Sequence, residues 1–272
     1  DARASGVLPL NGGDADLSLE AEIPDIAPLG AMAGQALTGS ALLTAKVTGP
    51  LDGSGAKGQA KLDISDFSAI DQPQLGALIE DSLVLATDLS FGADSGVALS
   101  NLALSAANLS VGGSLSLGAD FDELGGNYKV SIADISRLAV DLGLPIDGGL
   151  TIDGQLLGRI AQPGSRFTAS LPGLEAAGSL ILPANATLPQ GNVTLSVADA
   201  KHWRALAGLP QLHGSGQMKI TLAGSTAAPE LQAAGKLDQL VLAPSQTIES
   251  ATFEARLTDL LGNPGGSFTL DL

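Results

Sequence analysis

Apolar and polar residues alternate along most of this chain with a period of two. In the clearest runs Leu, Val, Ile, Ala, Met and Phe share one parity, and Ser, Thr, Asp and Gly fill many of the positions between them. These runs cover 17–23, 83–91, 109–117, 193–197 and 218–222. Because successive side chains of a strand point to opposite faces, each run predicts a strand with one aliphatic face and one small, polar face. About 17 such runs follow one another, separated by Gly, Asn, Asp and Pro turns.

One run changes parity in its middle. Val97 and Leu99 lie on one parity, whereas Leu102 and Leu104 lie on the other. A single extra residue in one strand restores the facing of the side chains that follow it. The sequence therefore predicts a β-bulge at Asn101.

A longer unit recurs three times. Each copy has an Asp, a Gly 14 or 15 residues later, a second Gly 10 residues after the first, and a Leu 13 residues further on. The copies are Asp25, Gly39, Gly49 and Leu62; Asp134, Gly148, Gly158 and Leu171; and Asp199, Gly214, Gly224 and Leu237. Repetition at a fixed spacing is typical of arrays of stacked units. We therefore expect repeat units at about 25–62, 134–171 and 199–237 within one continuous β body over 1–272, with no linker dividing it.

Four short helices are expected to interrupt the strands, at 25–33, 73–80, 134–142 and 199–208. In the last of these, Asp199 can cap the amino terminus and Gly208 can end the helix. Pro210 then prevents its continuation. The predicted fold class is all-β: an elongated, repetitive, open sheet, shaped as a half-pipe groove, with a few short helices.

Composition narrows the function. The chain is 44% hydrophobic, 15% charged and 3% aromatic. A catalytic cleft or a sugar-binding surface usually has more charged and aromatic residues. The net charge of −16 leaves no basic patch, which argues against nucleic-acid binding. The chain has no Cys, so disulfides and thiolate metal sites are excluded.

The motifs of common chemistry are nearly absent. Residues 53–58 match GxGxxG, but an alternating segment follows them instead of the helix that a dinucleotide site requires. His202 and His213 are not spaced as metal ligands, and Asp120, Asp122 and Glu123 lack a calcium-loop pattern. Three Asn residues match the glycosylation sequon, as chance readily produces in a Ser/Thr-rich chain: Asn108, Asn185 and Asn192. We therefore expect no enzyme activity, no metal and no cofactor.

Two features indicate a piece of a longer protein. The sequence starts without Met and stops inside an alternating run, SFTLDL. No apolar run approaches the roughly 18 residues of a membrane-spanning helix, and no signal peptide is visible. An anchor or signal is therefore expected to lie outside this sequence.

Two stretches resemble a known family. They are LHGSGQMKITLAGSTAAPELQAAGKLDQLVL and LSNLALSAANLSVGGSLSL. Both are similar to the periplasmic body of the TamB branch of the AsmA-like proteins, and the similarity extends over about 17–272. It is a similarity of rhythm rather than of catalytic residues.

The resemblance implies a function and a location. Such proteins are anchored in the inner membrane of Gram-negative bacteria and cross the periplasm as an open sheet with an apolar inner surface. They are thought to carry phospholipid towards the outer membrane. TamB also partners an outer-membrane barrel protein of the BamA superfamily and is linked to outer-membrane protein assembly. The family's anchor and partner-binding segments have no match in this sequence.

The residues and the resemblance together predict a lipid groove formed by one parity of the strands. Its expected residues are Leu83, Leu85, Leu89, Phe91, Leu109, Val111, Leu115, Leu117, Val193, Leu195, Met218, Ile220 and Leu222. Alternating aliphatic residues can equally fill a closed core, and the sequence alone does not separate the two. The alternatives are a scaffold or chaperone surface for outer-membrane strands, a secreted β-helical adhesin with a sealed aliphatic core, and a β-helical polysaccharide-degrading enzyme.

Overall fold

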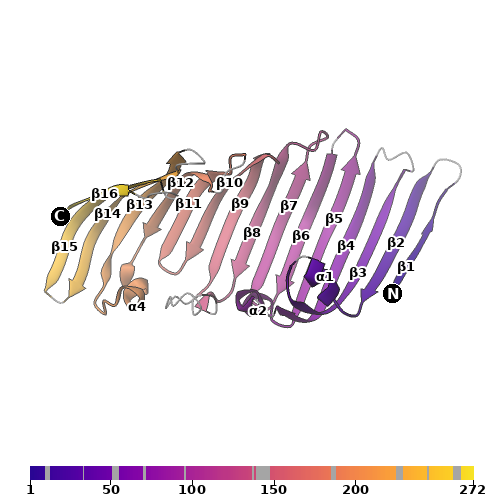
Figure 1. The fold of residues 1–272 in the computed structure, drawn as a ribbon, viewed down its shortest axis with the longest axis horizontal. Coiled ribbons are helices and arrows are strands. Elements are labelled where there is room, and N and C mark those ends of the chain that lie inside the picture. The colour runs from indigo at the N-terminus through magenta and orange to yellow at the C-terminus, as the bar shows by residue number, and fades with distance from the viewer. Residues whose placement is uncertain are drawn as a thin grey trace. The chain divides into compact units, whose positions relative to one another are not determined.

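The computed structural model is all-β, and its antiparallel strands follow one another in chain order (Figure 1). It describes residues 1–9, 13–32, 34–50, 55–69, 72–94, 96–136, 138, 148–184, 188–224, 229–243, 245–259 and 265–272. The chain divides into two compact units, Asp1–Leu138 and Ala139–Leu272. No linker or change of composition in the sequence predicts this division. The repeat units and the single continuous body over 1–272 stay predictions.

Unit 1 is an open antiparallel sheet in which β1 to β8 are neighbours in order. Its strands are β1 (Ala2–Val7), β2 (Asp14–Ile23), β3 (Leu37–Pro50), β4 (Ala56–Ala69), β5 (Ser82–Gly92), β6 (Gly96–Ala106), β7 (Leu109–Leu117) and β8 (Leu124–Ile132). Each strand pairs with the strands before and after it in the sequence, so the described part of this unit is built entirely from hairpin neighbours.

Unit 2 has the same plan, with β9 to β16 as neighbours in order. Its strands are β9 (Leu150–Arg159), β10 (Gln162–Leu171), β11 (Leu174–Ile181), β12 (Gln190–Val197), β13 (His213–Gly224), β14 (Pro229–Ala243), β15 (Gln246–Thr258) and β16 (Gly265–Asp271). The open, repetitive all-β sheet expected from the sequence is thus confirmed in both units.

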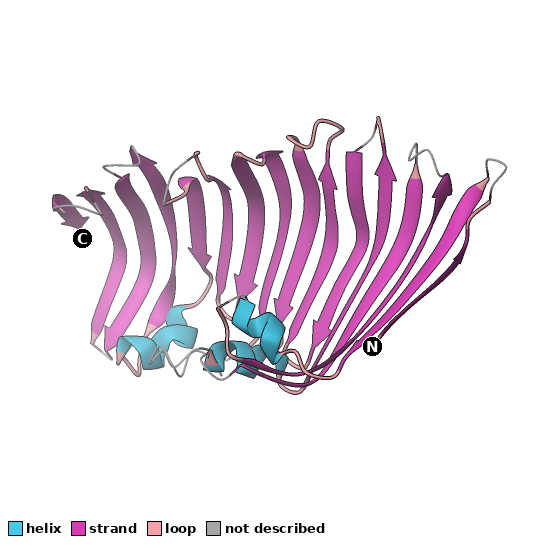
Figure 2. Cartoon of the chain, turned by 45° about the vertical axis from the view of Figure 1, so that its right-hand side comes forward, coloured by secondary structure: helices cyan, strands magenta, loops and turns pink. Residues whose placement is uncertain are grey.

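The helices are short, fall between strands in the order of the chain, and lie at the ends of the strands (Figure 2). In unit 1 they are α1 (Ala27–Met32) and α2 (Pro73–Ile79). In unit 2 the segment expected as one helix at 199–208 is a 3₁₀ turn, η1 (Ala200–Trp203), followed by α4 (Arg204–Ala207). Trp203, with φ −105° and ψ 8°, separates the two pieces. Most of the expected helix at 134–142 lies outside the described residues.

The Asp that opens each copy of the repeated sequence unit makes the same local bond. Asp25, Asp134 and Asp199 each accept a hydrogen bond at Oδ1 from the backbone N–H two residues later, at 2.9 Å. This bond satisfies one of the amide donors that a helix start leaves unpaired. At the other end of the last segment, Gly208 is left-handed with φ 65°, as expected for the residue that ends a helix.

β-Bulges adjust the facing of the described strands at several places. The pairing of β6 with β7 shifts between Leu99 and Leu102, and Asn101 has φ 51°. This confirms the bulge expected at Asn101. Similar shifts occur at Gly39 in β3 and at Gly214 in β13, where φ is 133° and 128°. A Cβ at either position would lie about 3 Å or less from a carbonyl oxygen of the next strand, so only Gly fits there.

Buried apolar residues of unit 1 gather at the end of the sheet that carries the helices. A cluster of Ile26, Ala41, Phe67, Ala69 and Ile79 forms there, with exposed fractions of 5 to 8%. Partly buried residues of α2 and of the strand ends pack against it, including Leu75, Leu78, Ile64 and Leu83. The helices therefore close one end of the sheet with an apolar contact.

Candidate functional site: the aliphatic face

The register of the strands shows which side chains share a face, because directly paired residues of antiparallel strands point to the same side. In unit 1 one unbroken row crosses six strands from β3 to β8. It consists of Leu43, Leu62, Leu85, Leu104, Val111 and Val130, each paired with the next. We call the face that carries this row the aliphatic face.

All of the predicted groove residues of unit 1 lie on the aliphatic face. Leu89 pairs with Leu99, which pairs with Leu115, and Phe91, Val97 and Leu117 form the next row. Leu83 pairs with Ile64, and Leu109 pairs with Ile132. The bulge at Asn101 is what brings the two halves of β6 to this one face. The structure thus gathers these residues on one surface, whereas their contact with lipid stays a prediction.

The five predicted groove residues of unit 2 also share one face of their sheet. Val193 pairs with Ile220, Leu195 with Met218, and Leu222 with Gly191. The rows continue through Ala233, Gly235 and Leu231 of β14 to Ala255, Phe253 and Leu257 of β15. In the regularly paired parts of the described strands, no position of either aliphatic face carries a charged residue.

The aliphatic face of each unit is only partly buried. No described side chain in the chain is less than 2% exposed, and several large apolar residues of these faces are well exposed. The exposed fractions are 46% for Leu17, 40% for Leu19 and 38% for Phe91 in unit 1, and 42% for Leu257 and 66% for Phe268 in unit 2. Within each unit, the described strands form one layer, so no second sheet covers this face. The face is an apolar surface without a partner.

The opposite face is polar and pairs its charges with one another. Lys46 bonds Asp16 at 3.2 Å and Lys61 bonds Asp63 at 2.8 Å in unit 1. In unit 2, Arg256 bonds Glu230 at 2.8 Å and Lys236 bonds Asp238 at 2.6 Å. These side chains are largely exposed, so each pair contributes little to stability. They keep the polar face hydrated, in contrast to the aliphatic face.

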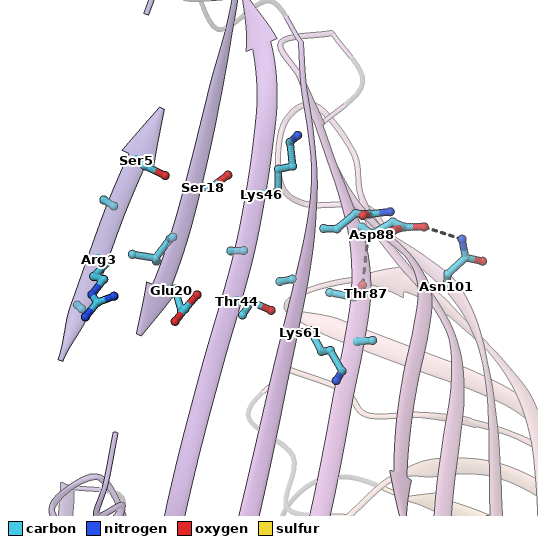
Figure 3. Close-up of a pocket in the computed structure, with 17 residues that line it drawn as sticks. Arg3, Ser5, Ser18, Glu20, Thr44, Lys46, Lys61, Thr87, Asp88 and Asn101 are labelled. Carbon is cyan, nitrogen blue, oxygen red and sulfur yellow. Dashed lines mark hydrogen bonds between the residues drawn. The ribbon is translucent and has the colours of Figure 1, made fainter. Parts of the chain in front are cut away.

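An open hollow of about 1170 Å³ lies over the polar face of β1 to β5 and reaches Asn101 of β6 (Figure 3). Its charged side chains are Arg3, Glu20, Lys46, Lys61 and Asp88. Each of the strands β1 to β5 contributes one of these charges, three positive and two negative, and Asn101 Nδ2 donates to Asp88 Oδ2 at 2.7 Å. Sequence reasoning missed this hollow, because it depends on the register of six strands. The described residues that line it are those of a solvent-exposed sheet surface and include no catalytic arrangement.

Asp199, Lys201, Arg204 and His213 form a polar cluster in unit 2. His213 Nδ1 lies 3.7 Å from Asp199 Oδ1, and Arg204 contacts the His213 ring while its Nε donates to Leu212 O at 2.9 Å. The hydrogen bond from the backbone N–H of Lys201, and next the bond from its side chain, hold the pKa of Asp199 below its usual value. The contact between His213 and Asp199 could not be predicted from local sequence patterns, because 14 residues separate the two.

The acidic cluster at Asp120, Asp122 and Glu123 forms a turn between β7 and β8. Asp120 Oδ1 accepts from the N–H of Asp122 at 3.2 Å, and Gly118 N donates to Glu123 O at 3.0 Å. Among the described residues, no three His, Cys, Asp or Glu side chains are grouped so as to hold a metal ion. The last residues of the GxGxxG match, 56–58, begin β4 rather than a helix. The rest of that match, 53–55, is described only at 55.

We compared the chain with known proteins once this geometry was established. No family model, no curated protein and no solved structure matches it. In the part of the chain that the structure describes, none of the helices has the length and apolar character needed to cross a bilayer.

Proposed function

We propose that this chain is part of a bridge that conducts phospholipid across the periplasm, between the inner and outer membranes, along its aliphatic face. The proposal includes a linked role in outer-membrane protein assembly with a barrel protein of the BamA superfamily, and anchoring in the inner membrane, both through segments outside this sequence. The similarity of the sequence rhythm to the TamB branch of the AsmA-like proteins suggested this function.

One observation carries the proposal: each unit exposes a broad aliphatic face that no described element covers along most of its strands. An exposed apolar surface of this extent on a protein marks a site of interaction with an apolar partner. Aromatic residues on it are few, and its cross-strand rows are made of Leu, Val and Ile, with Ala and Gly between them. Such a surface resembles the interior of a bilayer more than it resembles a protein interface.

The energetics suit movement rather than tight binding. Burial of each acyl CH₂ is worth about 0.8 kcal/mol in any apolar environment. A lipid that leaves a bilayer for the aliphatic face therefore exchanges one apolar environment for another of similar free energy. Rows of equivalent Leu and Val side chains present no single deep site, so a lipid can pass from one strand to the next.

Leu115 and Ser116 provide the test. Leu115 lies on the aliphatic face between Leu99 and Gly126, whereas the exposed Ser116 lies on the polar face between Ala98 and Gly125. In cells that make the full-length protein, a photo-crosslinking residue at Leu115 should capture phospholipid. The same residue at Ser116 should not. Native mass spectrometry of the purified chain should show co-purified phospholipid.

A charge on the aliphatic face separates an open groove from a sealed core. In an open groove, Leu115→Asp leaves the fold intact and stops lipid transfer, because the carboxylate is poorly solvated beside acyl chains. In a sealed core the same change unfolds the sheet. If Leu115 crosslinks only to protein and Leu115→Asp destroys folding, the lipid proposal is wrong and the adhesin or scaffold alternative takes its place.

A further inference from the structure

The two ends of the aliphatic face differ in unit 1. At one end the cluster around Ile26 and Ile79 covers the row formed by Ile23, Ala41, Ile64, Leu83 and Ala106. At the other end, next to the turns that join β1 to β2 and β5 to β6, Leu17 and Phe91 are 46% and 38% exposed. Among the described buried apolar residues of unit 1, Ala15 alone lies at this turn end. As far as the described residues show, the face is therefore covered at the helix end and exposed at the turn end.

In unit 2 the exposure of apolar residues also differs along the strands. Leu212, which follows α4, and Ala251 of β15 are buried, with exposed fractions of 7% and 2%. Leu257, at the other end of β15, is 42% exposed. In unit 2 the apolar residues of β15 are thus less exposed at Ala251 than at Leu257, the end away from the helices.

The length of the open part matches one kind of ligand. From the Leu85 row to the Phe91 row the strand advances six residues, or about 20 Å at about 3.3 Å per residue. A bilayer hydrocarbon core of about 30 Å holds two layers of tails, so one lipid tail spans about 15 Å. A tail of ordinary length that lies along the strands therefore fits between the helices and the turns.

We propose that α1 and α2 act as a stop that limits the length of the lipid tail and orients the lipid, with the tail end towards the helices and the polar headgroup at the turn end. This inference rests on the proposed function. The residues that form the stop surface are the partly buried apolar side chains of α2, Leu75 and Leu78, which pack on the buried cluster. The ligand class is an amphiphile with a polar group at one end only, because the helix end offers an apolar wall.

Single-tailed phosphatidylcholines that differ only in tail length test the stop. With the purified chain, affinity should rise roughly fourfold for each CH₂ added while the tail still lies on the open face. It should then level off, once the tail reaches α2. Leu75→Ala should move the levelling point to tails longer by about two carbons, because the truncation lengthens the open face. Leu78→Ala, tested separately with its fold checked by circular dichroism, should act in the same direction.

Leu29→Ala is the matched control. Leu29 is a Leu of α1 that is 51% exposed and lies outside the buried cluster, so its truncation should leave the levelling point unchanged. The stop is refuted if affinity rises without levelling in the original chain. It is also refuted if Leu75→Ala and Leu78→Ala level at the same tail length as the control Leu29→Ala. If no tail of any length binds, the proposed lipid function fails as well.

Crosslinking from the lipid tests the orientation. A photoreactive group at the end of the tail should label peptides that contain Leu62 and Leu85. A photoreactive headgroup should label peptides at the turn end, such as the one with Leu117. The reversed pattern, or equal labelling of both ends, would overturn the orientation.

Discussion

Asn108→Ala should destabilise unit 1 far more than its position in a two-residue turn suggests. Asn108 is the one buried polar residue among the described residues, with an exposed fraction of 7%. Its Oδ1 accepts from Asp134 N and its Nδ2 donates to Asp134 O, both at 2.7 Å. Its own backbone N–H donates to Leu78 O at 3.1 Å, and its carbonyl accepts from Ala133 N at 3.1 Å. Asn108 thus joins the end of α2 to the segment after β8.

The size of the effect follows from the two side-chain bonds. Each is worth about 1 kcal/mol net, and the Asp134 amide and carbonyl, which are half-buried, lose their partners when the side chain is removed. We expect the free energy of unfolding to fall by about 2 to 3 kcal/mol. Asn108→Asp should be no better, because its carboxylate would face the Asp134 carbonyl without a donor.

Urea unfolding followed by far-UV circular dichroism measures the effect, and amide hydrogen exchange locates it. The Asp134 N–H should exchange faster in Asn108→Ala. The matched control is Asn127→Ala, which removes an exposed Asn from the polar face of β8 and should change stability by less than about 0.5 kcal/mol. Equal effects of the two substitutions, or unchanged exchange at Asp134, would show that the bonds of Asn108 do not hold the helix end together.

The remaining predictions concern a cap, two glycines and the shape. Asp199→Ala should lower the thermal unfolding temperature by loss of the cap. Because folding lowers the pKa of Asp199, the contribution of its carboxylate is complete above the ordinary value of 3.8 and is lost as the pH falls through the lowered pKa, so the effect of the substitution should become smaller in acid. Gly39→Ala should destabilise by about 1 to 3 kcal/mol, since its φ is 133° and a Cβ would lie 2.7 Å from Ser65 O. Gly76→Ala, in α2 with nothing within 4 Å, should be neutral or stabilising by about 0.5 kcal/mol. The elongated body predicted from the sequence should give a radius of gyration well above the roughly 19 Å of a compact protein of this length, and a value near 19 Å would contradict it.

The period of two predicted most of the strands, and one departure from it predicted the bulge at Asn101. These features depend on neighbours in the sequence, which is why they could be read directly. The hydrogen bond that Lys201 N donates to Asp199 could be predicted for the same reason, since capping is local. The residues predicted to line a groove share one face of each unit because parity decides the facing of a residue within a regular strand, and their role in a groove stays a prediction.

The features that sequence reasoning missed depend on distant segments. Asn108 was noticed only as a sequon match, and its bond to Asp134 spans 26 residues. The packing of α1 and α2 onto the ends of β3 to β6 also could not be predicted, because short helices give too few apolar positions to show which surface they cover. The apolar face of an alternating strand is buried only if a second layer of strands or helices packs on it. The alternation of the sequence does not show whether such a layer exists.

The order of the strands bears on how the protein is made. Within each unit, every described strand pairs only with the strands just before and just after it in the chain. Its contacts are therefore local in sequence, and such topologies fold without waiting for long loops to close. During synthesis each new hairpin can add to the edge left by the previous one, so the aliphatic face grows strand by strand as the chain is released. The growing edge is at every stage a template for the next strand and, until that strand is added, an edge that another chain could pair with.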